Sequence, residues 1–185
     1  MKLLIVAAAS GAVFGLWVVR VYNRLVRLRN AAENAFSTVD VQLKQRCDLV
    51  PNVVAAVKGY MEHERETLRR LTELRARAVS GELSNTERLE ADTGMSRLLH
   101  RVMALVERYP ELKASRSVDD LQRTLNEVEA QIAAARRTYN AAVTELNTGI
   151  DLFPTNLVAG TLGFSARPLF TADEAERTAP RAVTA

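Results

Sequence analysis

The sequence predicts an all-α protein, with an N-terminal transmembrane helix that continues into an antiparallel up-and-down four-helix bundle of long helices. Three observations lead to this fold class. The 185 residues are rich in Ala, Leu, Arg, Glu and Val, and contain 8 glycines and 5 prolines; such a composition favours helices. The stretch from Leu3 to Val19 is uncharged. Beyond it, apolar residues recur at alternating steps of three and four, which indicates buried helical stripes.

The predicted anchor occupies residues 1–21. At 1.5 Å per residue, Leu3 to Val19 spans roughly 25 Å, slightly less than a hydrocarbon core of about 30 Å. The side chain of Arg20 can snorkel and extend the span to about Tyr22. A cleaved signal peptide is the alternative, because Ala7-Ala8-Ala9 offers small residues for a peptidase. Cleavage there would leave an apolar region shorter than the roughly 7–15 residues usual in a signal peptide, so we favour the anchor.

Charge around the anchor predicts its orientation. Only Lys2 and the amino terminus precede it, whereas a cluster of arginines follows it. The positive-inside rule therefore predicts a single-pass protein of the bacterial plasma membrane, with a short N-terminus outside and the helical domain in the cytoplasm. Each arginine can also add about 1 kcal/mol of attraction to anionic lipid, although a topology signal alone explains the cluster. The predicted lipid contacts are Trp17, Arg20, Tyr22, Arg24, Arg27 and Arg29.

The first helix of the bundle, which occupies residues 22–152, continues directly from the anchor. Its predicted end lies near Asp48 and Pro51, because Asp48 can cap a following helix and Pro51 is tolerated only in a first turn. Its stripe consists of Leu25, Leu28, Ala32, Phe36, Val39 and Leu43.

The second and third helices are bounded by turn and capping signals. The second stripe runs from Val53 to Ala78, and Ser80-Gly81 interrupts it. The spacing of Ser84 and Glu87 is that of a capping box and predicts the start of the third helix. Tyr109-Pro110 marks its end.

The fourth helix has the clearest periodicity. Ser117 to Asp120 is its predicted cap, the apolar stripe extends from Leu121 to Ile150, and Pro154 ends it. Four helices with short connections pack most simply as an up-and-down bundle. The fourth would then return toward the anchor, so residues 153–170 are expected to emerge near the membrane surface.

Residues 153–170 differ in character from the helices, and contain glycines, prolines and several large apolar residues. Exposed apolar residues in a loop of this kind are costly. The segment is therefore expected to pack on the bundle, to meet lipid, or to meet a partner. Its apolar members include Phe153, Leu157, Leu162, Phe164 and Phe170. Residues 171–185 are polar and are predicted to be disordered.

No pattern in the sequence predicts catalysis, a cofactor or a metal. His63-Glu64 begins a zinc-binding helix motif, but Thr67 stands where the second histidine is needed. The single cysteine, Cys47, is expected to be a small apolar side chain, since Asp48 beside it would raise the pKa of the thiol. The net charge of +3 is small for this length, and most basic residues are interleaved with acidic ones, so no nucleic-acid partner is predicted.

Several blocks of sequence resemble the bacterial LemA family. They are Tyr22 to Arg29, Phe36 to Leu68, Leu121 to Val143, and Phe153 to Gly160. The resemblance implies a short anchor, an antiparallel helical bundle, no established biochemical activity, and an association with a membrane zinc protease and envelope quality control. The family usually has Tyr where this chain has Cys47, and the chain departs from the family pattern after Phe170.

Polar residues at positions that match the family form a predicted brace or partner-binding surface: Asp40, Arg46, Asp48, Asn52 and Lys58 near the first turn between helices, and Glu129, Arg136, Tyr139 and Asn140 on the fourth helix. The protein is accordingly predicted to be a non-enzymatic membrane scaffold or adaptor that binds copies of itself or other envelope proteins. The alternative is a membrane-remodelling or lipid-organising protein that uses the arginines and residues 153–170.

Overall fold

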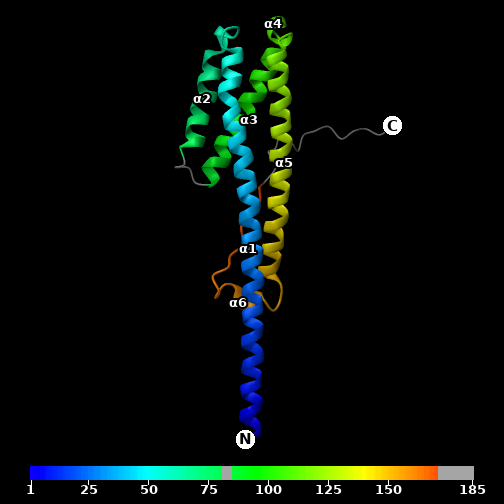
Figure 1. The fold of residues 1–185 in the computed structure, drawn as a ribbon. Helices are drawn as coiled ribbons and strands as arrows, with labels where there is room; N and C mark the ends of the chain where they lie inside the picture. The colour runs from blue at the N-terminus through cyan, green and yellow to red at the C-terminus, as the bar shows by residue number, and fades with distance from the viewer. Residues whose placement is uncertain (81–84, 171–185) are drawn as a thin grey trace, which may run out of the picture. The chain divides into compact units, whose positions relative to one another are not determined.

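The computed structural model describes residues 1–80 and 85–170, and this part of the chain contains helices and no strand (Figure 1). The all-α prediction is therefore confirmed. The elements are α1 (Lys2–Val57), the 3-10 helix η1 (Glu62–Glu64), α2 (Arg65–Val79), α3 (Asn85–Val106), α4 (Pro110–Lys113), α5 (Arg116–Asp151) and α6 (Asn156–Ala159). The chain forms two compact units. The first combines residues 1–37 with 136–185, and the second consists of residues 38–135.

Helix α1 continues without interruption from the predicted anchor into the bundle, as expected, but its predicted end near Asp48 and Pro51 is wrong. The helix runs to Val57 with Pro51 inside it. Proline has no N–H, so the carbonyl of Cys47, four residues earlier, loses its usual helical donor. Arg75 of α2 supplies a replacement, because its Nε donates to the Cys47 carbonyl at 3.0 Å. A side chain from another helix thus compensates for the proline.

The second predicted helix also begins later than expected. Val53 and Val57 belong to α1, and the turn falls at residues 58–61 instead of near Pro51. The amide of Met61 donates to the Val57 carbonyl at 3.0 Å. Met61 itself is fully buried. This buried side chain anchors the turn before η1 and α2 begin.

Helices α3 and α5 lie close to the predicted ranges. The predicted start signal at Ser84 is outside the described residues, and α3 is described from Asn85. The short helix α4, with Pro110 at its start, was not predicted. Helix α5 begins at Arg116, because the carbonyl of Ser115 accepts from the amides of Val118 and Asp119 at 3.1 Å. The predicted cap was therefore placed slightly too late.

The second unit has an apolar core to which α1, α2, α3 and α5 all contribute. Its fully buried members include Val53 of α1, Leu71 of α2 and Val102 of α3, and Leu125 of α5 is 5% exposed. Helices α2 and α3 pack against each other. Helix α2 contains 15 residues and is shorter than predicted, because the expected start of its stripe belongs to α1. The up-and-down arrangement of the whole bundle stays a prediction.

In the first unit, part of the segment 153–170 packs on the helices. Ala159 and Phe164 are buried in a small core with Val21 and Leu25 of α1. Gly163 adopts a left-handed φ of 79°, and the amide of Phe164 reaches back to the Ala159 carbonyl at 3.0 Å, as in a helix-ending Schellman turn. Of the three alternatives that the sequence left open for residues 153–170, packing on the protein therefore holds for part of the segment.

Within the described residues, no helix is both long enough and apolar enough to cross a membrane. This finding does not support the transmembrane helix predicted at residues 1–21. The predicted disordered tail at residues 171–185 lies outside the described residues.

Candidate functional site

Two polar constellations stand out, one in each unit, and the first surrounds Arg46. This side chain is 1% exposed, which is rare for arginine. Its guanidinium pairs with the carboxylate of Asp92 from α3 and, at 2.7 Å, with Glu129 Oε1 from α5. Ser96 of α3 donates to the same Glu129 oxygen at 3.2 Å. The cluster therefore ties three helices of the second unit together and satisfies a charge that burial would otherwise make costly.

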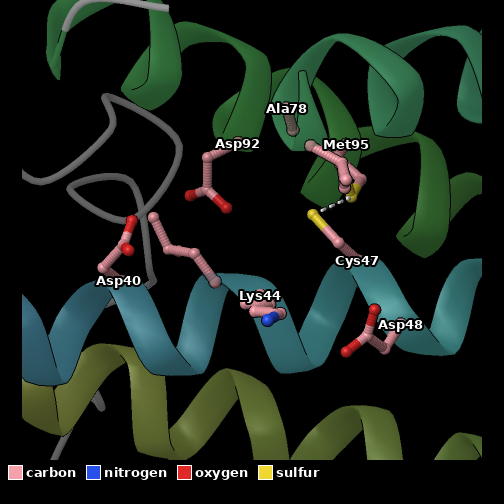
Figure 2. Close-up of a pocket in the computed structure, with 9 residues that line it drawn as sticks. Asp40, Lys44, Cys47, Asp48, Ala78, Asp92 and Met95 are labelled. Atoms are coloured by element: carbon pink, nitrogen blue, oxygen red, sulfur yellow. Dashed lines mark hydrogen bonds between the residues drawn. The ribbon is translucent and has the colours of Figure 1, made fainter. Parts of the chain in front are cut away.

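A cavity of about 260 Å³ lies beside this cluster (Figure 2). The thiol of Cys47 faces Met95, with 4.0 Å between the two sulfur atoms. Burial raises the pKa of the Cys47 thiol, and the nearby Arg46 only partly opposes that effect. At neutral pH the thiol is therefore protonated and a poor nucleophile. The cavity is lined by Asp40, Leu43, Lys44, Cys47, Asp48, Ala78, Val79, Asp92 and Met95.

Within the described ranges, no three His, Cys, Asp or Glu side chains lie close enough to hold a metal ion. His63 is exposed. On α2, Glu66 instead accepts hydrogen bonds from Arg69 and Arg70, which lower the pKa of its carboxyl group to about 2. This face of α2 is a solvated network of charges.

The second constellation holds an extended segment, residues 164–170, which we call the strap. Two asparagines of α5 each bind one strap residue through both backbone groups. Asn140 Nδ2 donates to the Phe170 carbonyl, and the Phe170 amide donates to Asn140 Oδ1, both at 2.8 Å. Asn147 makes the same pair of 2.8 Å bonds with the backbone of Arg167. The side-chain amides thus take the place of a neighbouring β-strand.

Side-chain contacts hold the two ends of the strap. The Phe170 ring lies 4.7 Å from the ring of Tyr139 and stacks on Phe36 with centroids 6.3 Å apart. The guanidinium of Arg136 lies over Phe170, at 5.9 Å from its centroid. The guanidinium of Arg167 donates to Glu33 of α1 at 2.8 Å. We call the surface that holds the strap the receiving surface; it consists of Glu33, Phe36, Arg136, Tyr139, Asn140 and Asn147.

The predicted brace residues separate into several environments. Arg46 joins Glu129, and Asp40 and Asp48 line the cavity. Asn52 and Lys58 are exposed. The remaining members, Arg136, Tyr139 and Asn140, belong to the receiving surface of the other unit.

The predicted lipid contacts have mixed exposure. Arg20, Arg24 and Arg27 are exposed, and Trp17 and Arg29 are half-buried. Arg29 lies over the Phe164 ring, at 5.6 Å from its centroid, and that ring also meets Tyr22 edge-on at 5.8 Å. Trp17 also packs against the small core of this unit, so three of the predicted lipid contacts make contacts within the protein. In the apolar segment, Phe153 and Leu157 are exposed, whereas Leu162 and Phe170 are half-buried.

Sequence reasoning missed several members of these constellations. Asp92, Glu33 and Asn147 received no role, although each contacts a residue or segment that did. One signal was available for Asn147. It lies seven residues after Asn140, which is about two helical turns, so the two amides share one side of the helix. No local pattern distinguishes Asp92 from other acidic residues.

Comparison with known proteins gives consistent matches. A model of the LemA family matches residues 35–183. The chain is 30% identical over 155 residues to Protein LemA of Metamycoplasma hominis, covering 84% of this chain and 71% of that protein. It is 24% identical over 193 residues to Magnetosome protein MamQ 1 and to Magnetosome protein MamQ 2 of Paramagnetospirillum magneticum, covering 91% of this chain and 71% of each relative. None of these names denotes an enzyme.

Proposed function

We propose, starting from the fact that this chain belongs to the LemA family, that it is a membrane-associated, non-enzymatic scaffold or adaptor. It acts through protein–protein contacts of its helical units, including contacts with copies of itself. Residues 1–21 attach it to a bacterial membrane, and the helical units lie in the cytoplasm.

The observation that carries the membrane-associated part of the proposal is the exposed apolar surface at the start of α1. Val13, Phe14 and Leu16 are 67%, 59% and 62% exposed. Removing a large apolar side chain from water is worth about 1.5–3 kcal/mol. Because several such residues follow one another, a bilayer is the cover that we propose. Further exposed members are Leu3, Ile5, Val6 and Val19.

Charge supports attachment to the cytoplasmic face. Arg20, Arg24 and Arg27 are exposed and follow the apolar surface directly. Cationic residues beside an apolar segment are attracted to anionic lipid and favour the cytoplasmic side. The family resemblance adds envelope quality control as the process in which the protein acts, and a membrane protease as a partner to be tested.

Fractionation of cells that produce the full chain tests membrane attachment. The Val13→Lys/Leu16→Lys variant places two charges on the apolar surface and is expected to move the protein from the membrane fraction to the soluble fraction. The Gln131→Lys/Thr144→Lys variant is the matched control, because it adds the same charge at two exposed positions of α5. If both variants partition like the unaltered protein, or if the unaltered protein is soluble, attachment through this surface is refuted.

A second candidate function is lipid organisation, and one observation favours it. Leu152, Phe153 and Leu157 remain 49%, 77% and 68% exposed, although other residues of the segment pack on the helices. They belong to the same unit as the arginines. Vesicles rich in phosphatidylglycerol test this role with full-length protein. Loss of vesicle clustering in Phe153→Ser/Leu157→Ser, with attachment retained, would support it; unchanged clustering, or none by the unaltered protein, would refute it.

A further inference from the structure

The receiving surface has the properties of a docking site for an extended peptide. Asn140 and Asn147 bind only backbone atoms of the strap, so these four hydrogen bonds do not depend on which side chains the peptide carries. Main-chain bonds of this kind give affinity, and side-chain contacts give specificity. Specificity here comes from Glu33, which accepts from Arg167, and from the rings that surround Phe170.

The spacing of the two asparagines fits an extended chain. Seven helical residues advance about 10.5 Å, at 1.5 Å per residue. Three extended residues, from Arg167 to Phe170, advance about 10 Å at roughly 3.3 Å per residue. One asparagine every seven helical residues therefore matches, in length, every third residue of an extended peptide. A backbone that repeats every three residues is that of polyproline II, because the backbone groups of a β-strand face alternate sides from one residue to the next. The pairing of Asn147 with Arg167 and of Asn140 with Phe170 also fixes the direction, so that the strap runs opposite to α5.

The strap is held by side chains and not by regular secondary structure. Among the described residues, the backbone–backbone bonds of turns and loops end at Phe164 and do not include residues 165–170. Ser165, Ala166, Pro168 and Leu169 are exposed. The strap follows the turn at Gly163, where glycine tolerates the left-handed backbone.

We propose that the receiving surface binds the strap of a second copy of this chain, in exchange for its own. A second copy carries the peptide that the surface already fits, and the contacts that Arg167 and Phe170 make with α1 and α5 involve groups that another copy supplies in the same form. Exchange of identical segments is a low-cost route to assembly. Attachment to a membrane raises the local concentration of copies, which favours exchange; in this respect the inference rests on the proposed function.

Cross-linking between distinguishable copies tests the exchange. All copies carry Cys47→Ser, which removes the single native cysteine. One full-length copy carries Glu33→Cys, and another, of different size through a tag, carries Arg167→Cys. These two positions are in contact in the structure. Copies mixed on vesicles of phosphatidylethanolamine and phosphatidylglycerol, and treated with a short bis-maleimide, are expected to give a mixed dimer.

Three controls make the result specific. Asn126→Cys, at an exposed position of the other unit, replaces Arg167→Cys and measures random collision. Asn140→Leu/Asn147→Leu in the Glu33→Cys copy removes the receiving bonds, and circular dichroism checks that the helices are retained. Phe170→Ser in the Arg167→Cys copy weakens the strap alone. Both changes are expected to reduce the mixed dimer to the collision level.

Two outcomes would overturn the inference. If mixed copies give no dimer above the collision level, while a single chain with Glu33→Cys/Arg167→Cys cross-links internally, the strap acts only within its own chain. If the mixed dimer forms but is insensitive to the asparagine and phenylalanine variants, the copies meet at another surface. Neither outcome affects membrane attachment, which fractionation tests separately.

Discussion

The compensation of Pro51 by Arg75 gives a quantitative prediction about the second unit. The Nε of Arg75 donates to the Cys47 carbonyl at 3.0 Å, and that carbonyl has lost its helical donor to the proline. A hydrogen bond from a charged donor contributes about 1.5–3 kcal/mol. Arg75 is half-buried, so we expect Arg75→Met to lower the free energy of unfolding by about 1–2 kcal/mol.

The effect is expected to depend on Pro51. In a Pro51→Ala background, the new amide can donate to the Cys47 carbonyl in the ordinary helical way. Arg75→Met should then cost at least about 1 kcal/mol less than it does with proline present. Urea unfolding followed by circular dichroism measures all four proteins of this cycle.

A matched control separates this bond from a general loss of charge. Arg77 is exposed on the same helix, and Arg77→Met is expected to change stability by no more than about 0.5 kcal/mol. An Arg75→Met cost that is the same in both backgrounds would refute the compensation. A cost equal to that of Arg77→Met would refute it as well.

Three further predictions concern the ionisable groups. Arg46→Leu removes the guanidinium that pairs with the buried carboxylate of Asp92 and should lower the free energy of unfolding by about 3–5 kcal/mol, with partial recovery in Arg46→Leu/Asp92→Leu. Thermal unfolding measures both variants, and a cost of Arg46→Leu under about 1 kcal/mol would contradict the structure. Because the folded pKa of Glu66 is lowered from 4.5 to about 2, its stabilising effect should be present above about pH 4.5 and lost as the pH falls toward 2. Glu66→Gln should flatten acid unfolding over that range, and a curve like that of the unaltered protein would count against the network. Cys47 should react with a thiol reagent at pH 7.5 far more slowly in native protein than in urea, since burial raises its pKa; equal rates would show an accessible thiolate.

Periodicity predicted the elements whose burial repeats along one helix face. The stripe of α5 is an example, since Val128, Ile132 and Val143 are buried as expected. Periodicity also predicted that α1 continues from the anchor into the bundle. It failed at Pro51, because Arg75, which compensates for the proline, lies 28 residues from the Cys47 carbonyl to which it donates. A contact of that kind leaves no local pattern.

The candidate sites were predictable only in part. Arg46, Glu129 and Asn140 were singled out, but their partners were not all evident. Asp92 lies 46 residues from Arg46 in the sequence. Asn140 bonds the backbone of Phe170, and a contact to backbone atoms leaves no pattern in the identity of the side chains. The strap is extended and has no periodicity of burial, so its position on α5 followed from neither its composition nor its spacing. Its packing against the protein was one of three alternatives that composition left open.

In-cell cross-linking of the full-length protein tests the scaffold role most directly. Cells that produce the tagged chain are treated with a membrane-permeable lysine cross-linker, and the captured proteins are identified by mass spectrometry. The account predicts covalent multimers of this chain, or defined complexes with envelope proteins, that are lost in Val13→Lys/Leu16→Lys and retained in Gln131→Lys/Thr144→Lys. The scaffold role would be contradicted if the protein remained strictly monomeric and captured no membrane protein above the level seen with Val13→Lys/Leu16→Lys.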